Sequence, residues 1–285
     1  MEIWFLIMIF VLGLCCGSFV NMLVYRTTIE YKLIKSKSLK KNKNINFLKT
    51  LGGRSFCDSC GRQLKWYENI PVISWVIQRG KTKCCNKKLP VQYPIVEIVM
   101  GILFLINFKF LIFNFYSNQN FLNLNFKTVL ELILSFVIIT FLVFSAVFDL
   151  KYMILPDFST VILTICAMVI LFVETPDLAS LQWKVLSAII SFGFLYFLYL
   201  ITKKRGMGFG DVKLAFFMGL FLGYPKVIVA MYIAFVVGAL IGLILMLFKK
   251  AGKKSKISFG PFLILGTIVA WFWGDILIKF LMSNF

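Results

Sequence analysis

Two aspartates are candidates for chemistry because each lies at the edge of a long apolar run. Asp149 ends the run "FSAVFD", and Asp211 precedes the run "VKLAFF". A carboxylate beside a membrane segment is costly unless it is hydrated, paired or neutralised. Two carboxylates that converge at one membrane edge could share a proton and activate a water molecule for hydrolysis. We therefore interpret these two residues as a candidate catalytic pair.

Three glycines, Gly206, Gly208 and Gly210, come just before the second aspartate. Glycine permits backbone angles and close approaches that a Cβ atom resists, so this loop could bring Asp211 beside a reacting peptide. The alternative is a glycine-rich turn between two helices, in which the aspartate caps the second helix. These residues alone leave both interpretations open.

Four cysteines form a second candidate site: Cys57, Cys60, Cys84 and Cys85. Four thiolates could hold a tetrahedral zinc ion and so order a loop too small to build its own core. Because the second pair is adjacent instead of separated by two residues, reduced cysteines that bind no metal are the alternative. A cytoplasmic location argues against structural disulfides. The other three cysteines lie in apolar runs and are expected to pack there: Cys15, Cys16 and Cys166.

The elements that must position these residues are membrane helices. The chain is 60% hydrophobic with 32 Phe, and its mean hydropathy is +0.89, which excludes an ordinary soluble globule. The sequence predicts an all-α polytopic membrane protein with about eight transmembrane helices and a cytoplasmic cysteine-bearing loop between helices 1 and 2. The sixth run is short for a full crossing, so it should pack within the bundle or have different limits. The predicted spans lie near residues 3–25, 92–113, 127–148, 157–173, 183–202, 211–223, 226–248 and 257–281.

Charge sets the expected orientation. Residues 26–90 contain 12 Lys and 4 Arg but only three acids. This loop therefore carries most of the protein's net charge of +19. Basic residues near span ends are retained in the cytoplasm, so we expect this loop inside and both termini outside. Anionic membrane lipids account for the basic charge, and no nucleic-acid partner is expected. The first segment lacks a basic n-region and reaches spanning length, so we interpret it as a retained helix.

The sequence predicts three parts. Residues 1–25 form the first transmembrane helix, and residues 26–90 form a basic cytoplasmic loop with a candidate zinc-binding subdomain at 54–90. Residues 91–285 form the transmembrane core that carries both aspartates.

Six motifs, in order over residues 16–266, give the chain a family resemblance. They are "CGSFVNMLVYR" (16–26), "WYENIPVISWVIQRGK" (66–81), "VQYPIVEIVMG" (91–101), "FDLKYMILPD" (148–157), "GMGFGDVKLAFFMGLFLG" (206–223) and "ISFGPFLILG" (257–266). Together they resemble the prepilin peptidases, which are membrane aspartic proteases with a G-x-G-D motif.

The resemblance implies that Asp149 and Asp211 are the catalytic aspartates and that prepilins or pseudopilins are the substrates. It also implies a bacterial inner-membrane enzyme that cleaves the leader peptide at the cytoplasmic boundary without a cofactor for proteolysis. Many members also N-methylate the new terminus with S-adenosylmethionine, which makes this an expected second activity here. No residue is assigned to that cofactor. Asp157 falls at the Pro-Asp position of the family, where we interpret it as a helix N-cap or structural acid.

The cysteine loop departs from the family pattern. Counted back from Tyr93 and Pro94, the third loop cysteine of the family falls at Thr82 and the fourth at Cys85, which leaves Cys84 as an extra neighbour. Either Cys84 replaces the missing ligand, or zinc binding is weakened or absent.

Helix dipoles predict a division of roles between the two acids. Asp211 at a helix N-terminus should favour its anion, and Asp149 at a helix C-terminus should favour its neutral acid. The main rival function is a transporter that uses intramembrane carboxylates for cation or proton coupling. That class places its acids near the membrane midplane and often repeats broken helices, and the sequence has no convincing internal repeat. A presenilin-like protease is a second rival, but its Pro-Ala-Leu segment is absent from the sequence.

Overall fold

Helices dominate the structure, a computed structural model that describes residues 2–31, 33, 55–57, 60–117, 126–174, 178–203, 207–248 and 258–283. Eight long helices occur in these residues, close to the eight predicted apolar runs. They are α1 (Glu2–Glu30), α4 (Gln92–Ser117), α5 (Phe126–Tyr152), α6 (Asp157–Glu174), α7 (Leu178–Ile201), α8 (Phe209–Leu222), α9 (Lys226–Leu247) and α10 (Gly260–Ser283). Two short elements, η2 (Trp66–Asn69) and α3 (Ile73–Ile77), lie in the loop between α1 and α4.

Six of the described helices are long and apolar enough to cross a membrane: α1, α4, α5, α7, α9 and α10. Helix α6 is apolar but shorter, and α8 has only 14 residues. The all-α polytopic architecture predicted from composition is therefore confirmed, and the fourth and sixth runs, α6 and α8, are the two that are shorter than the six candidate spans.

The chain forms two compact units, residues 1–120 and residues 121–285. In the first unit α1 packs against α4, and glycines allow the two backbones to approach closely. A Cβ atom at Gly13 would lie 2.7 Å from the Cα of Gly101, which leaves no room for a side chain. Small residues at such crossings are typical of membrane helices. The structure groups α4 with α1 in the first unit. The division expected from sequence differs, because it assigned α4 to the transmembrane core at residues 91–285.

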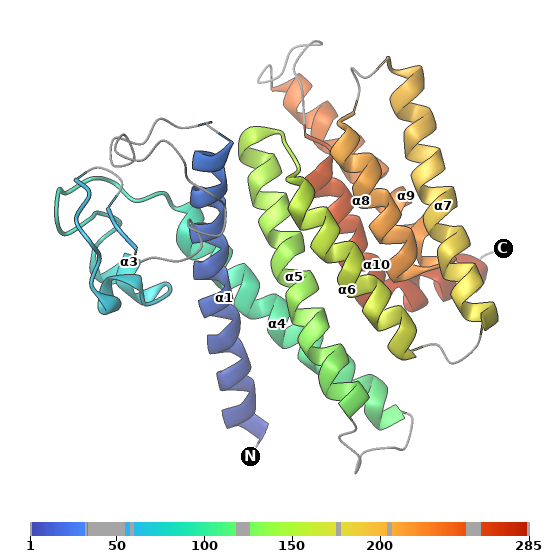
Figure 1. Cartoon of the computed structure of the whole chain (residues 1–285), viewed down its shortest axis with the longest axis horizontal. Coiled ribbons are helices and arrows are strands. Elements are labelled where there is room, and N and C mark those ends of the chain that lie inside the picture. Colours follow the sequence, from blue (N-terminus) through green and yellow to red (C-terminus); the bar gives the residue numbers. More distant parts are fainter. Residues whose placement is uncertain are drawn as a thin grey trace. The chain divides into compact units, whose positions relative to one another are not determined.

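In the second unit α8 is the central helix, and α6, α7, α9 and α10 all contact it (Figure 1). Its apolar residues are buried around most of its circumference, including Val212, Leu214 and Phe217. Its contact with α7 is close, because Gly219 lies against the backbone of Ala188. A helix covered by protein on several sides does not need the length of a helix that faces lipid, which explains why the sixth run is short.

Candidate active site and cysteine cluster

The two candidate aspartates lie at helix ends within the second unit. Asp149 comes three residues before the end of α5, and Asp211 is the third residue of α8. Both are buried, with exposed fractions of 4% and 5%. Leu155 packs against Gly210, the neighbour of Asp211, and against Gly260, which lies at the carboxylate of Asp149. These shared contacts bring two buried acids from distant parts of the sequence into one site.

The glycine loop holds the second aspartate through its backbone. The N–H of Gly208 donates to Oδ2 of Asp211 at 3.1 Å. Gly208 has an ordinary extended backbone, with φ −77° and ψ 150°. Gly210 is needed for a close approach, since a Cβ atom there would lie 2.7 Å from the Cβ of Leu155. Gly206 lies outside the described residues.

The partners of Asp149 come from the start of α10. The hydroxyl of Ser258 donates to Oδ2 of Asp149, and the N–H of Gly260 also donates to this carboxylate. Sequence reasoning missed both residues, because 109 positions separate Ser258 from its partner. One signal was present in the Gly260–Pro261 pair, since proline favours the first turn of a helix, where N–H groups have no partner within the helix.

Both acids therefore face helix N-termini. Asp211 lies in the first turn of α8, and Asp149, near the C-terminal end of α5, accepts hydrogen bonds at the N-terminus of α10. A helix N-terminus favours an anion. The dipoles of α5 and α8 predict that Asp211 is the anion and Asp149 the neutral acid. The N-terminus of α10 offsets this prediction, because it also favours an anion at Asp149. Helix dipoles alone therefore do not assign the proton to one of the two acids.

Asp157 has a different environment. It is the first residue of α6, and its carboxylate accepts from Nζ of Lys213 at 2.7 Å, which joins α6 to α8. The side chain is 70% exposed. Of the two expected roles, helix N-cap or structural acid, this arrangement favours the second. Asp157 is already the first helical residue, and its carboxylate forms an ion pair with Lys213.

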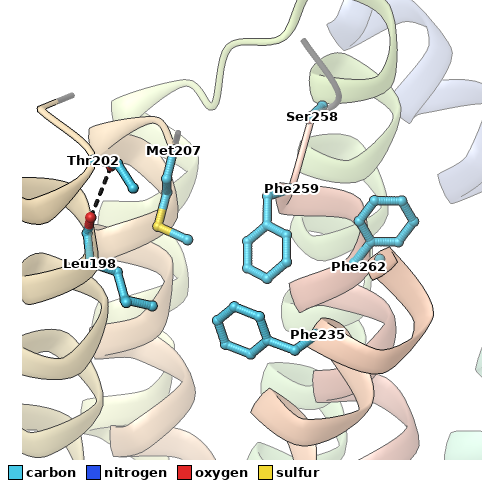
Figure 2. A pocket seen from close by; sticks show the side chains of 8 residues that line it. Leu198, Thr202, Met207, Phe235, Ser258, Phe259 and Phe262 are labelled. Carbon is cyan, nitrogen blue, oxygen red and sulfur yellow. Dashed lines mark hydrogen bonds between the residues drawn. The ribbon is translucent and has the colours of Figure 1, made fainter. Parts of the chain in front are cut away.

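A mostly apolar cavity of about 270 Å³ lies next to residues that neighbour the acids, although neither acid lines it (Figure 2). Ser258, which binds Asp149, lines it, and so does Met207, the neighbour of Gly208. Figure 2 shows the rings of Phe235, Phe259 and Phe262 on one side of this space, with Leu198 and Thr202 of the α7 end opposite. The volume falls below the roughly 300–1,000 Å³ of pockets that hold drug-sized ligands, so the cavity is of side-chain size.

The four candidate metal ligands lie together in the first unit. Two similar turns carry them, and each turn is closed by an isolated antiparallel bridge, between Phe56 and Gln63 and between Lys81 and Lys88. In the first turn the Cys57 N–H donates to Arg62 O and the Gly61 N–H to Cys57 O. In the second turn the N–H groups of Thr82 and Asn86 donate to Lys87 O and Thr82 O in the same pattern.

This correspondence places Thr82 where the first turn has Cys57, and Cys85 where the first turn has Cys60. Cys84 nevertheless reaches the cluster, with its Sγ 3.2 Å from that of Cys60. The hydroxyl of Thr82 instead contacts the Cys85 sulfur at 3.2 Å and accepts from the Lys87 N–H. The sequence lacks a cysteine at position 82, but in the folded loop the sulfur of Cys84 supplies the fourth thiol of the cluster.

The sulfur positions suit a tetrahedral ion. All four Sγ atoms lie within 4.8 Å of one another, with 3.6 Å between Cys57 and Cys85 and 3.8 Å between Cys84 and Cys85. Zn–S bonds of about 2.3 Å in a tetrahedron place sulfurs about 3.8 Å apart. The residues therefore fit zinc. A bound ion would hold the two turns together.

The thiols of the cluster differ in acidity. The hydrogen bond with Thr82 lowers the pKa of Cys85 to about 6. The hydrogen bond with Cys60 raises the pKa of Cys84 to about 12, while the pKa of Cys60 is lowered, first by the backbone N–H of Arg62. Binding of a metal ion would require all four thiols to lose their protons. The structure describes all seven cysteines, and they form no disulfide with one another.

Comparison with known proteins places the chain in a family. Residues 11–111 match the profile of the bacterial peptidase A24 N-terminal domain, and residues 136–243 match the type IV leader peptidase family. A prepilin leader peptidase/N-methyltransferase of Stutzerimonas stutzeri is 27% identical over 95% of this chain and 91% of its own length. The protein of the same name from Legionella pneumophila is 29% identical over 97% of this chain and 94% of its own. No solved structure matches. Because the two profiles and the full-length relatives agree along almost the whole chain, this protein belongs to the type IV leader peptidase family.

Proposed function

We propose that this protein is a membrane aspartic endopeptidase that removes the leader peptide of prepilins or pseudopilins, with Asp149 and Asp211 as the catalytic pair. The observation that carries the proposal is the convergence of two buried acids on the start of α8 and the start of α10. Family membership and the multi-pass helices support an enzyme of the bacterial inner membrane. We place the site at the cytoplasmic face, because the basic loops are expected there.

The chemistry needs both acids in different states. Two nearby carboxylates cannot both ionise cheaply, so the pair holds one proton between them. The ionised member takes a proton from water as the water oxygen attacks the scissile carbonyl, and the protonated member donates a hydrogen bond to the carbonyl oxygen. The tetrahedral intermediate then collapses as the C–N bond breaks, and a proton passes to the leaving amine. Ser258 and the N–H groups of Gly208 and Gly260 hold the two carboxylates in place.

The geometry disfavours the transporter interpretation. Carboxylates that bind a transported ion lie near the bilayer midplane between discontinuous helices. Here Asp149 and Asp211 lie within three residues of the ends of α5 and α8. The cavity lined by Ser258, the partner of Asp149, is bordered mostly by apolar side chains, which suits part of an apolar polypeptide better than a hydrated ion path.

We include N-methylation of the new terminus as a second activity, with S-adenosylmethionine as the methyl donor. Its support is the name that the relatives share, prepilin leader peptidase/N-methyltransferase, and their coverage of the N-terminal unit with its cysteine cluster. A methyl group would pass from the sulfonium of the donor to the free amine that cleavage creates, and that amine would lose a proton.

The test is cleavage of a purified prepilin by the protein in lipid nanodiscs, followed by mass spectrometry. Asp149→Asn and Asp211→Asn should each reduce the cleavage rate by at least about 10²-fold, because each removes an acid–base group. Asp157→Asn is the matched control and should stay within about threefold, since an exposed ion pair contributes little. Full turnover by either of the first two variants would refute the assignment. Adding S-adenosylmethionine separates the activities, because methylation adds mass only to the cleaved product.

A further inference from the structure

The loop segment around α3 folds back along the transmembrane helices instead of extending away from them. The backbone N–H of Val72, just before α3, donates to Oε2 of Glu97 at 2.7 Å. Glu97 is buried in α4, lies against Gly17 of α1 and also bonds the side chain of Ser18. Figure 1 shows α3 level with the middle part of α1, not beyond its C-terminal end.

Helix lengths convert this contact into a depth. Ser18 precedes the last residue of α1 by 12 positions, which is about 18 Å of helix at 1.5 Å per residue. The 29 residues of α1 span about 43 Å, against about 30 Å for the hydrocarbon core. Even if the whole excess of about 13 Å projected on the loop side, the contact would lie at or below the hydrocarbon boundary. Val72 is therefore level with the bilayer.

The surface next to this contact is apolar. Ile73, Val76 and Ile77 have the i, i+3, i+4 spacing of one helical face and are 56%, 59% and 67% exposed. Trp66 of the adjoining η2 is 80% exposed. We call these four residues the interfacial patch. Val91 and Ile95, at the start of α4, are also exposed, and α4 is long and apolar enough to cross a membrane.

The charge around the patch is positive. Within the described residues 55–57 and 60–90, seven Lys and Arg side chains are exposed. The acid described there, Glu68, is buried and pairs with Arg62 at 3.2 Å. Exposed cations near an anionic leaflet are attracted to its headgroups. The cations are Arg62, Lys65, Arg79, Lys81, Lys83, Lys87 and Lys88.

We propose that the cysteine-bearing subdomain is seated in the membrane interface, with the interfacial patch among acyl chains and the surrounding cations on anionic lipid headgroups. An interfacial element of this kind buries its apolar face about 5–10 Å into the headgroup and acyl boundary, with Trp at the edge. This seating fixes the subdomain at the level of the bilayer surface. It is independent of whether the protein cleaves prepilins.

Site-specific photocrosslinking tests the seating. A benzoylphenylalanine is introduced at Ile77, at Ile73, or at Lys83 as the exposed polar control, in the full-length protein in nanodiscs. Two lipid compositions are used, phosphatidylcholine alone and phosphatidylcholine with phosphatidylglycerol. We expect about tenfold more lipid adduct from positions 73 and 77 than from position 83, because only the apolar face reaches the acyl chains. The yield should rise with phosphatidylglycerol because of the surrounding cations.

Three outcomes would overturn the proposal. Crosslinks from position 77 to a second copy would make the patch a protein interface, and crosslinks to another part of the same chain would make it an internal contact. Equal lipid adducts at positions 77 and 83 would show that the apolar face has no special access to lipid. Because positions 73 and 77 are both exposed, loss of the fold in one variant does not remove the test.

Discussion

Gly260 lies directly against the carboxylate of Asp149, at a distance that leaves no space for a Cβ atom. The end of a flexible side chain can rotate away, so Gly260→Ala should preserve the fold and displace the carboxylate. A displacement of about 1 Å from a catalytic position can cost about 10²-fold in rate, and we expect a loss of this size in prepilin cleavage. Cleavage rates and thermal melting of the purified variant measure the two effects separately.

Gly193→Ala is the matched control for this prediction. Gly193 lies within α7, where a Cβ atom would meet nothing within 4 Å. The variant should cleave at the wild-type rate and gain up to about 1 kcal/mol, because alanine favours the helix. If Gly260→Ala cleaves as fast as Gly193→Ala, the position of Asp149 is not under the steric control that we describe.

The two glycines that come just before Asp211 in the described residues, Gly208 and Gly210, should respond differently to alanine. Gly210→Ala brings a Cβ atom within 2.7 Å of the Cβ of Leu155, which cannot rotate away, so the start of α8 must move. We expect at least about a tenfold loss of cleavage and a lower melting temperature, with overpacking costs of about 1–3 kcal/mol. In Gly208→Ala the new Cβ atom meets Oδ2 of Asp211 at 3.6 Å and the backbone N of Gly210 at 3.9 Å, both ordinary contacts, so the variant should stay within about threefold of wild type. Equal losses in both variants would contradict this ranking.

The helices were predictable from sequence because lipid demands long apolar runs. The run predicted at 226–248 corresponds to α9 at Lys226–Leu247, and the one at 157–173 to α6 at Asp157–Glu174. The two aspartates could also be selected, since a carboxylate beside such a run is rare and costly. Their partners could not. Ser258 meets Asp149 only through the packing of α10 on α5, and no local pattern encodes a contact between residues so far apart.

The geometry of the cysteine loop could not be predicted from the sequence either. The sequence shows Thr82 in place of a cysteine, but only the folded turns show that the sulfur of Cys84 lies with the other three sulfurs of the cluster. The contact between Val72 and Glu97 likewise depends on how the loop returns along α4. Sequence patterns therefore predict which residues are chemically unusual, and tertiary packing decides which of them meet.

Zinc content tests the cysteine cluster. The purified wild-type protein should retain about one zinc ion, which a strong chelator removes, because four thiolates form a closed tetrahedral site. Cys60→Ser and Cys84→Ser should each lose most of the bound zinc, whereas Cys166→Ser, in α6 of the other unit, should keep it. Metal analysis of the purified variants measures the content directly.

The double variant Cys84→Ser/Thr82→Cys sharpens this test. It moves the fourth thiol to the position that corresponds to Cys57 in the first turn, and the matching hydrogen-bond pattern of the two turns predicts that zinc binding returns. Full zinc retention by Cys84→Ser alone would show that this cysteine is idle.

Val72 combines backbone strain with a buried anchor. With φ 59° and ψ −54° it is the centre of a γ-turn closed by the Ile73 N–H and Pro71 O at 2.5 Å, a conformation that is rare and strained for a β-branched residue. Such strain costs about 1–3 kcal/mol and persists only where other contacts maintain it. The hydrogen bond to Glu97 is the contact that maintains it here.

Glu97→Ala removes the hydrogen-bond acceptor of the Val72 N–H, so the turn should open more often. Val72→Gly should lower the strain of the turn and keep it closed. Loss of a hydrogen bond to a carboxylate costs about 1.5–3 kcal/mol, so in the first variant the amide of Val72 should exchange with deuterium roughly ten- to a hundredfold faster. In the second variant the anchor remains and glycine tolerates positive φ, so its amide should exchange at or below the wild-type rate. Hydrogen–deuterium exchange of the peptide that contains residue 72 provides the measurement in both cases. Unchanged exchange in Glu97→Ala would mean that the turn is held by contacts other than this carboxylate.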